Sequence, residues 1–294
     1  MRQKIFTLEK SYREGVRKLQ EAGVPDAKLD AWYLLEHVTG VSRAYYLGHP
    51  DQEMDEDQEE KYQELIARRQ QRIPLQHLTG EQYFMGYPFF VNEHVLIPRQ
   101  DTEILVEEAS KYLKPGMRLL DVCTGSGCIL LSLLKLFPEV AGIGCDISDQ
   151  ALKVAKENAK RLDVPGVCLV HSDLFSEITG NYDMIVSNPP YIPTEEIEKL
   201  QAEVRLFDPM IALDGKADGL YFYRKIIKES TRYLRLGGRL LFEIGHDQGK
   251  AVTGLMEEAG YSQIMVKKDL AGLDRVVCGM YNKRVVENSS RTKM

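Results

Sequence analysis

The residues whose types and spacing most clearly suggest chemistry are Asn188, Pro189, Pro190 and Tyr191, which directly follow an apolar stretch at residues 182–187. A planar amide or aniline-like nitrogen is a weak nucleophile with two N–H donors, so a site that activates it needs acceptors. The Asn188 side-chain oxygen can accept one N–H and the Pro189 carbonyl the other, while Tyr191 can pack on the flat face of the group. The tetrapeptide therefore predicts a site that acts on a planar nitrogen, although a Pro-Pro pair can also be only a rigid turn.

A second segment, at residues 119–129, places a glycine-rich turn between an apolar strand and a helix. The turn is Cys123-Thr124-Gly125-Ser126-Gly127, and its glycines let the backbone approach a ligand closely. A dinucleotide-binding fingerprint would have Gly or Ala three residues after Gly127, where this chain has Leu130. The Gly-Lys-Ser/Thr ending of a Walker A loop is absent from the sequence as well. The turn therefore argues against NAD and against a nucleoside triphosphate.

Three acidic residues lie where successive predicted strands end. Asp121 could reach the ammonium group of a methionine moiety, directly or through water, and Asp146 could accept hydrogen bonds from both hydroxyls of a ribose. Asp173 suits the amino group of an adenine, with Leu174 or Phe175 against the ring. Any one of these acids could be only a helix cap or a turn residue. Together with the glycine-rich turn they favour S-adenosylmethionine, whose sulfonium methyl the activated nitrogen would attack in line, the proton leaving after transfer.

Further motifs give the chain a close resemblance, over essentially its whole length, to the HemK/PrmC family of release-factor glutamine N5-methyltransferases. It departs from the usual family pattern at Gln100, Asp208 and Leu273, none of which is assigned to the chemistry. The segments that carry the resemblance are residues 97–103, 121–127, 188–191, 208–209, 212–215, 218–220, 243–245 and 269–275.

The resemblance implies methyl transfer to the side-chain amide nitrogen of the glutamine in the Gly-Gly-Gln motif of class I peptide chain release factors, with S-adenosylhomocysteine as product. From the residues alone, an adenine N6-methyltransferase acting on nucleic acid is the alternative, because such enzymes share the Asn-Pro-Pro-Tyr tetrapeptide. A scaffold without activity would be expected to lose Asn188 or the glycine-rich turn, and both are intact.

The pattern along the chain predicts an α/β protein with a helical domain at residues 1–75, a β-hairpin linker at 76–97, a catalytic domain at 98–284 and a polar tail at 285–294. The resemblance implies that the catalytic domain is a Rossmann-like class I methyltransferase domain and that the helical domain docks the protein substrate. The catalytic domain should contain a mostly parallel sheet whose last two strands pair antiparallel. Its seven strands are expected at 117–123, 140–146, 166–171, 182–187, 239–245, 262–268 and 274–282, with helices at 127–137, 149–162, 194–205, 217–235 and 248–259.

Two finer expectations concern helix ends and faces. Asp101 can cap the helix that precedes the first strand of the sheet. In the helical domain, the spacing of Leu29, Trp32, Tyr33 and Val38 predicts the apolar face of the second helix.

Composition and charge restrict which partners, cellular location and metal sites we expect for this chain. The 294 residues carry a net charge of -6, which argues against stable binding to nucleic acid. The most apolar stretch, residues 129–137, is far shorter than the ~20 residues of a membrane span, and the charged N-terminus is unlike a secretory signal, so we expect a cytoplasmic protein with no membrane partner. The five cysteines have no metal-ligand spacing, which predicts buried thiols and no metal site.

Overall fold

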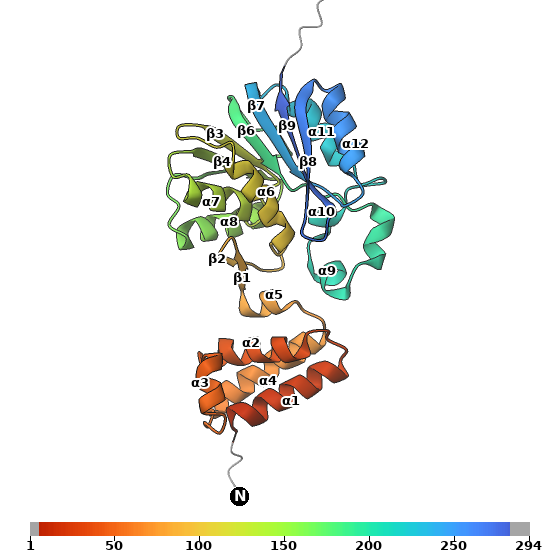
Figure 1. Cartoon of the computed structure of the whole chain (residues 1–294). Helices are drawn as coiled ribbons and strands as arrows, with labels where there is room; N and C mark the ends of the chain where they lie inside the picture. The colour runs from red at the N-terminus through yellow and green to blue at the C-terminus, as the bar shows by residue number, and fades with distance from the viewer. Residues whose placement is uncertain (1–5, 283–294) are drawn as a thin grey trace, which may run out of the picture. The chain divides into compact units, whose positions relative to one another are not determined.

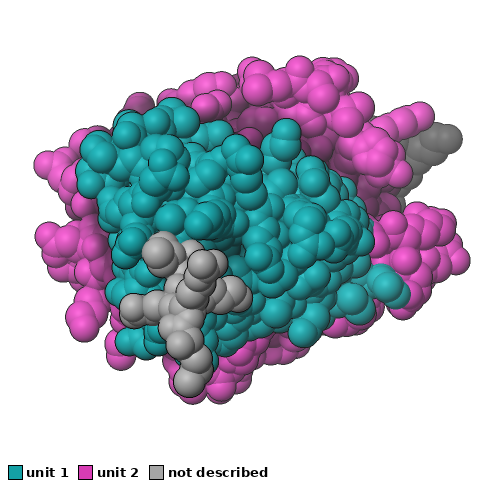
Figure 2. Space-filling model, turned by 90° about the horizontal axis from the view of Figure 1, so that it is seen from below, with its two compact units in different colours: residues 1–81, 201–207 teal, residues 82–200, 208–294 magenta. Residues whose placement is uncertain are grey.

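The computed structural model describes residues 6–282 and divides the chain into two compact units (Figures 1 and 2). The first extends to Glu81 and includes the later segment Gln201–Phe207, and the second comprises Gln82–Leu200 and the chain from Asp208 onward. The chain therefore leaves the second unit once, contributes seven residues to the first, and returns. The predicted polar tail at 285–294 lies outside the described residues.

The first unit is helical, and its core gathers the apolar faces of its helices. These are α1 (Leu8–Glu21), α2 (Ala27–Thr39), α3 (Arg43–Gly48), α4 (Glu56–Gln70) and α5 (Leu75–Thr79), joined by α9 (Ala202–Phe207). Thr7 caps α1, and Asp55 forms a capping box with Gln58 at the start of α4. Trp32 and Tyr62 are fully or almost fully buried.

The apolar face predicted for α2 was partly wrong. Leu29 and Tyr33 are 43% and 44% exposed, whereas Ala31, Leu34 and Leu35 are fully buried with Trp32. Helical spacing defines several stripes on a helix this rich in apolar residues, and packing against α1 and α4 selects the one that is buried.

A buried ion pair holds α9 in the helical unit. Arg69 of α4 donates to Asp30 of α2 at 2.7 Å and to Glu203 of α9 at 3.0 Å, and Arg72 donates to the other Glu203 oxygen at 2.7 Å. The side chain of Arg69 is only 7% exposed. Because a buried guanidinium needs its acceptors and they need it, the three helices are tied together at this point.

The second unit contains a seven-stranded sheet, as predicted, in the order β5-β4-β3-β6-β7-β9-β8 (Figure 1). All its pairs are parallel except β7–β9 and β8–β9. The strands are β3 (Arg118–Val122), β4 (Ala141–Asp146), β5 (Cys168–His171), β6 (Tyr182–Ser187), β7 (Leu234–Glu243), β8 (Tyr261–Lys268) and β9 (Asp274–Tyr281). The expected antiparallel pairing of the last two strands is confirmed.

Helices cover both faces of this sheet and create two apolar cores. One core joins Leu119, Val186 and Leu241 of the strands to α6 (Gln100–Ser110), α7 (Cys128–Leu136) and α8 (Asp149–Arg161). The other joins the neighbouring, opposite-facing Leu120 and Ile185 to α11 (Tyr221–Ser230) and α12 (Gly249–Glu258). Alternate residues of each central strand thus point to opposite cores, as a sheet buried on both faces requires.

Several predicted elements differ in the structure. The helix expected at 194–205 is a 3-10 helix, η1 (Thr194–Lys199), followed by an extended Leu200 and then α9, because α9 packs in the helical unit. The helix expected at 217–235 is confined to α11. A Cβ on Gly219 would lie 2.3 Å from the Tyr191 carbonyl oxygen, and residues from Leu234 onward pair in β7. Asp101 does not cap α6, whose N-cap is Arg99. Between η1 and α11 lies the short helix α10 (Met210–Leu213).

The predicted hairpin is present as β1 (Glu81–Phe84) and β2 (Tyr87–Phe90). Phe84 and Phe89 are 1% and 0% exposed and meet edge to face, 6.0 Å between ring centroids. These aromatic rings therefore belong to the core of the second unit. Among the cysteines, Cys128, Cys145 and Cys278 are buried as expected, but Cys168 is exposed and Cys123 is partly exposed.

The ion pair of Arg69 gives a prediction about stability. Arg69→Met should lower the free energy of unfolding of the helical unit by about 3–5 kcal/mol, because Asp30 and Glu203 would lose their partner in a buried environment. Urea denaturation followed by circular dichroism measures this loss. Arg68→Met, at an exposed position of the same helix, is the matched control and should change stability little. Equal stability of the two variants would contradict the assignment.

Candidate active site

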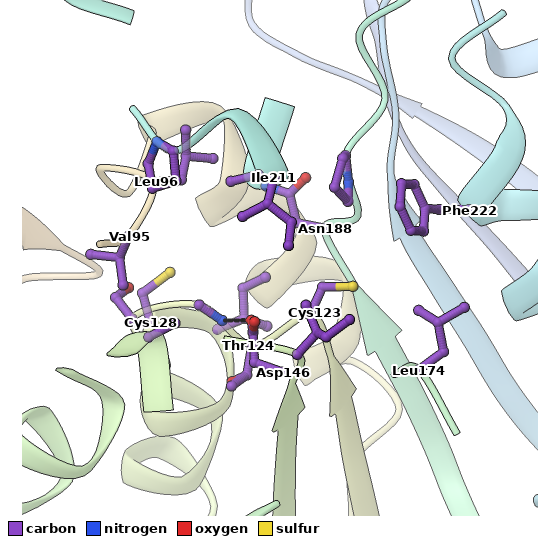
Figure 3. A pocket seen from close by; sticks show the side chains of 18 of the residues that line it. Val95, Leu96, Cys123, Thr124, Cys128, Asp146, Leu174, Asn188, Ile211 and Phe222 are labelled. Atoms are coloured by element: carbon purple, nitrogen blue, oxygen red, sulfur yellow. Dashed lines mark hydrogen bonds between the residues drawn. The ribbon is translucent and has the colours of Figure 1, made fainter. Parts of the chain in front are cut away.

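A cavity of about 330 Å³ lies in the second unit beyond the carboxyl ends of the parallel strands (Figure 3). This volume is in the range of small-molecule sites, and the carboxyl edge is where open α/β sheets bind their ligands. Of the predicted site residues, nine line the cavity: Cys123, Thr124, Gly125, Ser126, Asp146, Asp173, Leu174, Asn188 and Pro190. Asp121, Gly127, Pro189 and Tyr191 are not among its lining residues.

The two motifs meet because their strands are neighbours in register. Val122, the last residue of β3, pairs with Ser187, the last residue of β6, and the Ser187 hydroxyl donates to the Val122 carbonyl at 2.6 Å. The glycine-rich turn starts one residue after the first of these positions, and Asn188 follows the second. The strand order also reverses between β3 and β6, so the two segments diverge and leave a crevice.

The glycine-rich turn has a backbone that its sequence makes possible. Cys123, Gly125 and Gly127 have φ of 62°, 55° and 79°, and Gly127 is the N-cap of α7. A Cβ on Gly127 would lie 3.1 Å from Leu131 and 3.3 Å from Ala155 in addition to its strained φ, so only glycine fits without rearrangement. The glycines of the turn therefore leave their backbone open to a ligand at this end of α7, beside the cavity-lining residues Cys123 and Thr124.

Asp146 fixes the turn from the end of β4. One of its carboxylate oxygens accepts from the Gly125 amide and the other from the Ser148 amide, both at 2.9 Å. Burial raises the pKa of Asp146, while these backbone hydrogen bonds and that of Ile147 act in the opposite direction. A carboxylate offers about four acceptor positions in all, so Asp146 can still accept from a diol in the cavity.

Asp121 lies behind the turn and is fully buried. The Thr124 hydroxyl donates to one of its oxygens at 2.6 Å, and the other oxygen has no partner among the described residues. Burial raises the pKa of Asp121 to about 7, against the lowering effect of the Thr124 hydrogen bond. Because Thr124 lines the cavity and Asp121 does not, Asp121 would act on a ligand through Thr124 or a water molecule.

At the far end of the cavity, Asp173 is exposed and Leu174 supplies an apolar wall. Phe175, the other candidate for the adenine ring, instead stacks on Tyr233 at 4.9 Å in the core. Phe222 of α11 lines the cavity near Leu174, as Figure 3 shows. A hydrophobic slot with an acid beside it suits an aromatic base with an exocyclic amino group.

The tetrapeptide that follows β6 has some residues in the wall of the cavity and others outside it. Asn188 and Pro190 line the cavity, whereas the Tyr191 hydroxyl donates to the Glu243 carboxylate at 3.3 Å. Burial and the nearby Glu243 carboxylate raise the pKa of Tyr191 well above its usual range. Packing of Tyr191 on the flat face of a substrate is therefore not the arrangement seen here.

Several lining residues were not assigned to the site from the sequence. His94, Val95 and Leu96 come from the segment after β2, Ile211 from α10 and Phe222 from α11. Arg99 also lines the cavity and donates to the buried Asp208 at 2.6 Å. Burial raises the pKa of Asp208 to about 6, and the Arg99 guanidinium opposes that rise. The sequence contained one indication that this region contributes to the site, because residues 97–103, 208–209 and 212–215 carry part of the family resemblance.

The cavity fits S-adenosylmethionine in three respects: a glycine cradle that a Cβ would fill, a carboxylate at the end of β4, and an apolar slot beside an acid. The fold and this site define a class I S-adenosylmethionine-dependent methyltransferase. Two family descriptions match the chain, the PrmC N-terminal domain over residues 11–80 and the methyltransferase small domain over residues 99–269. The chain belongs to the family of release factor glutamine methyltransferases.

Relatives named release factor glutamine methyltransferase support that membership. The protein from Caulobacter vibrioides is 40% identical over 281 residues, covering 94% of this chain and 97% of its own length. The protein from Geobacter sulfurreducens is 39% identical over 276 residues, again covering 94% and 97%. A methyltransferase structure from Pyrococcus furiosus, 16% identical, has a TM-score of 0.52 over 68% of this chain and 91% of its own, which supports the fold alone.

The position of Asp146 gives a prediction about cofactor affinity. Asp146→Ala should raise the Kd for S-adenosylmethionine about 10- to 100-fold, because it removes the acceptor for the Gly125 amide and for a bound diol. Isothermal titration calorimetry measures the Kd. Asp149→Ala, three residues on at an exposed position of α8, should leave it unchanged. A wild-type Kd for Asp146→Ala would remove this residue from the binding site.

Proposed function

We propose that this methyltransferase transfers the methyl group of S-adenosylmethionine to the side-chain amide nitrogen (N5) of the glutamine in the Gly-Gly-Gln motif of class I peptide chain release factors. The observation that carries the proposal is the position of Asn188, which faces the same cavity as the glycine-rich turn. The names of the relatives, release factor glutamine methyltransferase, support the substrate.

The chemistry assigned to the chain is that of two neutral acceptors. When bound, the cofactor supplies a methyl group on a cationic sulfur. The Asn188 side-chain oxygen and the Pro189 carbonyl accept the two amide N–H groups of the glutamine, which orients the nitrogen lone pair and stabilises the positive charge that develops on nitrogen. The methylated nitrogen is then acidic and gives its extra proton to water, so the chain needs no dedicated general base.

The cofactor contacts are assigned in the same way. We assign the backbone of the turn, with Cys123, Thr124, Gly125, Ser126 and Gly127, to the methionine moiety, with Asp121 acting through Thr124 on its ammonium group. Asp146 is assigned to the ribose hydroxyls. We assign Asp173 and Leu174 to the adenine.

The helical unit is assigned to docking of the protein substrate. It exposes Leu29 and Tyr33 one turn apart on α2, an apolar pair that a protein partner could cover. A translation factor as substrate places the enzyme in the cytoplasm, and within residues 6–282 no helix has the length and apolarity of a membrane span. The net charge of -6 favours a protein substrate over nucleic acid.

The test of this function is a labelling experiment. Purified enzyme is incubated with radiolabelled methyl donor and, in separate reactions, a class I release factor, the same factor with Gln→Ala in its Gly-Gly-Gln motif, duplex DNA and RNA. We expect label only in the unchanged release factor, mapped by mass spectrometry to the glutamine amide. Label in adenine of a nucleic acid, with none in the factor, would replace the proposal by the alternative activity.

Replacement of Asn188 tests its role in that reaction. Asn188→Ala should lower kcat at least about 100-fold, because one of the two acceptors for the reacting nitrogen is lost, while the Kd for S-adenosylmethionine stays within about tenfold. Single-turnover kinetics with the release factor and calorimetry with the cofactor separate the two effects. Normal turnover at saturating cofactor would show that Asn188 only contributes to cofactor binding.

The raised pKa of Asp121 predicts a pH dependence of cofactor binding. Below pH 7 the buried carboxyl is largely protonated and neutral, so it attracts the ammonium group less than the ionised form does. The Kd for S-adenosylmethionine should therefore be roughly tenfold higher at pH 6 than above pH 7.5. Asp121→Asn should bind weakly at both values and lose most of this change, while the titration of the cofactor itself is common to both proteins. If the Kd of wild type and of Asp121→Asn changed in the same way with pH, Asp121 would be excluded as the source of that pH dependence.

A further inference from the structure

The segment that carries the two assigned acceptors is stiff along its length. The rings of Pro189 and Pro190 fix φ at about −65°, and each residue that precedes a proline is restricted as well. The backbone from Asn188 to Pro190 therefore moves mostly as one piece. The direction in which it presents the Pro189 carbonyl depends on how its two ends are held.

The sheet holds the first end. Ser187, directly before Asn188, pairs with Val122 of β3, and its hydroxyl donates to the Val122 carbonyl at 2.6 Å. This contact fixes the point at which Asn188 leaves β6. It does not by itself fix the direction of the Pro189 carbonyl further along the chain, which requires a second point of attachment.

Gln248, the N-cap residue of α12, holds the other end. Its side-chain Nε2 donates to the Tyr191 carbonyl at 2.9 Å and, at the longer distance of 3.4 Å, to the Gly219 carbonyl. Its Oε1 accepts from the Gly245 amide at 3.0 Å. Gln248 is buried and is not among the lining residues of the cavity, so it acts on the site through these backbone groups.

The partners of Gln248 allow only one orientation of its side-chain amide. A backbone N–H can only donate and a carbonyl can only accept, so the oxygen faces Gly245 and the NH2 group faces Tyr191 and Gly219. The backbone N–H of Gln248 also donates to the Gly245 carbonyl at 3.0 Å, which closes a turn between the two residues. The donor is therefore directed at the Tyr191 carbonyl without the help of any ionised group.

Two glycines let a later loop pack against the same carbonyl. A Cβ on Gly215 would lie 2.7 Å from the backbone carbon of Tyr191. A Cβ on Gly219 would lie 2.3 Å from the Tyr191 oxygen and 2.6 Å from Nε2 of Gln248. The Gly215 amide donates to the Ile192 carbonyl at 2.8 Å and holds the loop in this place. Backbone thus packs closely around the carbonyl that Gln248 holds.

We propose that Gln248 is a positioning residue for methyl transfer. By holding the last residue of the tetrapeptide, it fixes the direction of the two acceptors, the Asn188 side chain and the Pro189 carbonyl. The inference rests on the proposed function, which assigns these two groups to the nitrogen that is methylated. Because Gln248 lies outside the cavity wall, its loss changes the rate of the chemical step and leaves cofactor binding nearly unchanged.

Two substitutions change these hydrogen bonds with little change in volume. Gln248→Glu keeps the shape, but when ionised it has no donor for the Tyr191 carbonyl. Gln248→Met removes the donor and the acceptor together. Thr253→Val is the matched control, because it also removes a polar atom from α12, and the Thr253 hydroxyl is buried with no hydrogen-bond partner among the described residues.

We expect Gln248→Glu and Gln248→Met each to lower kcat on a release factor about 10- to 100-fold, because the acceptors are no longer held in the productive direction. KM for the factor and Kd for S-adenosylmethionine should stay within about threefold of wild type. Thr253→Val should match wild type in all three. Steady-state kinetics with the factor and calorimetry with the cofactor give these values.

Gln248→Glu also provides a readout that depends on pH. Burial raises the pKa of a carboxyl at this position, as does the Asp274 carboxylate beside Gly249. The protonated form can donate to the Tyr191 carbonyl, so kcat relative to wild type should rise as the pH falls from about 8 to about 6. The other titratable groups are common to both proteins and cancel in this ratio. For Gln248→Met, which has no titrating group here, the ratio should stay constant.

Wild-type kcat in both Gln248 variants would overturn the inference, as would a ratio for Gln248→Glu that does not change with pH. A higher KM and a higher cofactor Kd with unchanged kcat would show that Gln248 only supports the shape of the cavity. Methylation of the release factor by the wild-type enzyme is measured first. Its absence would count against the proposed function, whereas its presence with unaffected variants counts against the positioning role alone.

Discussion

The site depends on burial of acidic side chains at one edge of the sheet. Asp121, Asp146 and Glu243 end or nearly end β3, β4 and β7, and burial raises the pKa of all three. A buried carboxylate is stable only where donors surround it, so each one organises its neighbourhood. Asp121 takes the Thr124 hydroxyl, Asp146 takes the backbone of the turn, and Glu243 takes Tyr191. The hydrogen bonds that hold the cavity wall follow from these requirements.

The register between neighbouring strands brings these residues together in one site. Val122 and Ser187 are paired at the ends of neighbouring parallel strands, so the glycine-rich turn and Asn188 emerge side by side although 61 residues separate Asn188 from Gly127. Parallel strands place such segments at the same edge, and the reversal of strand order opens the space between them. The segments that we propose to bind the methyl donor and the acceptor amide therefore line one pocket without any long loop to position them.

The parts that sequence could predict are those set by local pattern. The seven strands, the positive-φ turn at Gly127 and Asn188 after β6 all follow from short segments with strong chemical requirements. The features that the sequence did not predict depend on tertiary packing. The helix α9 separates from η1 because Glu203 pairs with Arg69. Leu29 is exposed because α1 and α4 pack against another face of α2. The cavity residues Ile211 and Phe222 were missed because they lie on α10 and α11, which follow the tetrapeptide in the sequence and reach the cavity only in the folded chain.

The choice of asparagine at position 188 follows from the same electrostatics. An aspartate there would add another carboxylate at an edge where Asp121, Asp146 and Glu243 already have raised pKa values, and mutual repulsion would favour its protonation. An asparagine offers an acceptor without charge, which suits a substrate amide that is neutral before the reaction. Its disadvantage is that an amide presents a donor as readily as an acceptor when nothing orients it. A neutral acceptor at this edge therefore benefits from a contact that holds its NH2 group, and the Thr102 hydroxyl, which lines the same cavity, lies 3.5 Å from the Asn188 amide nitrogen.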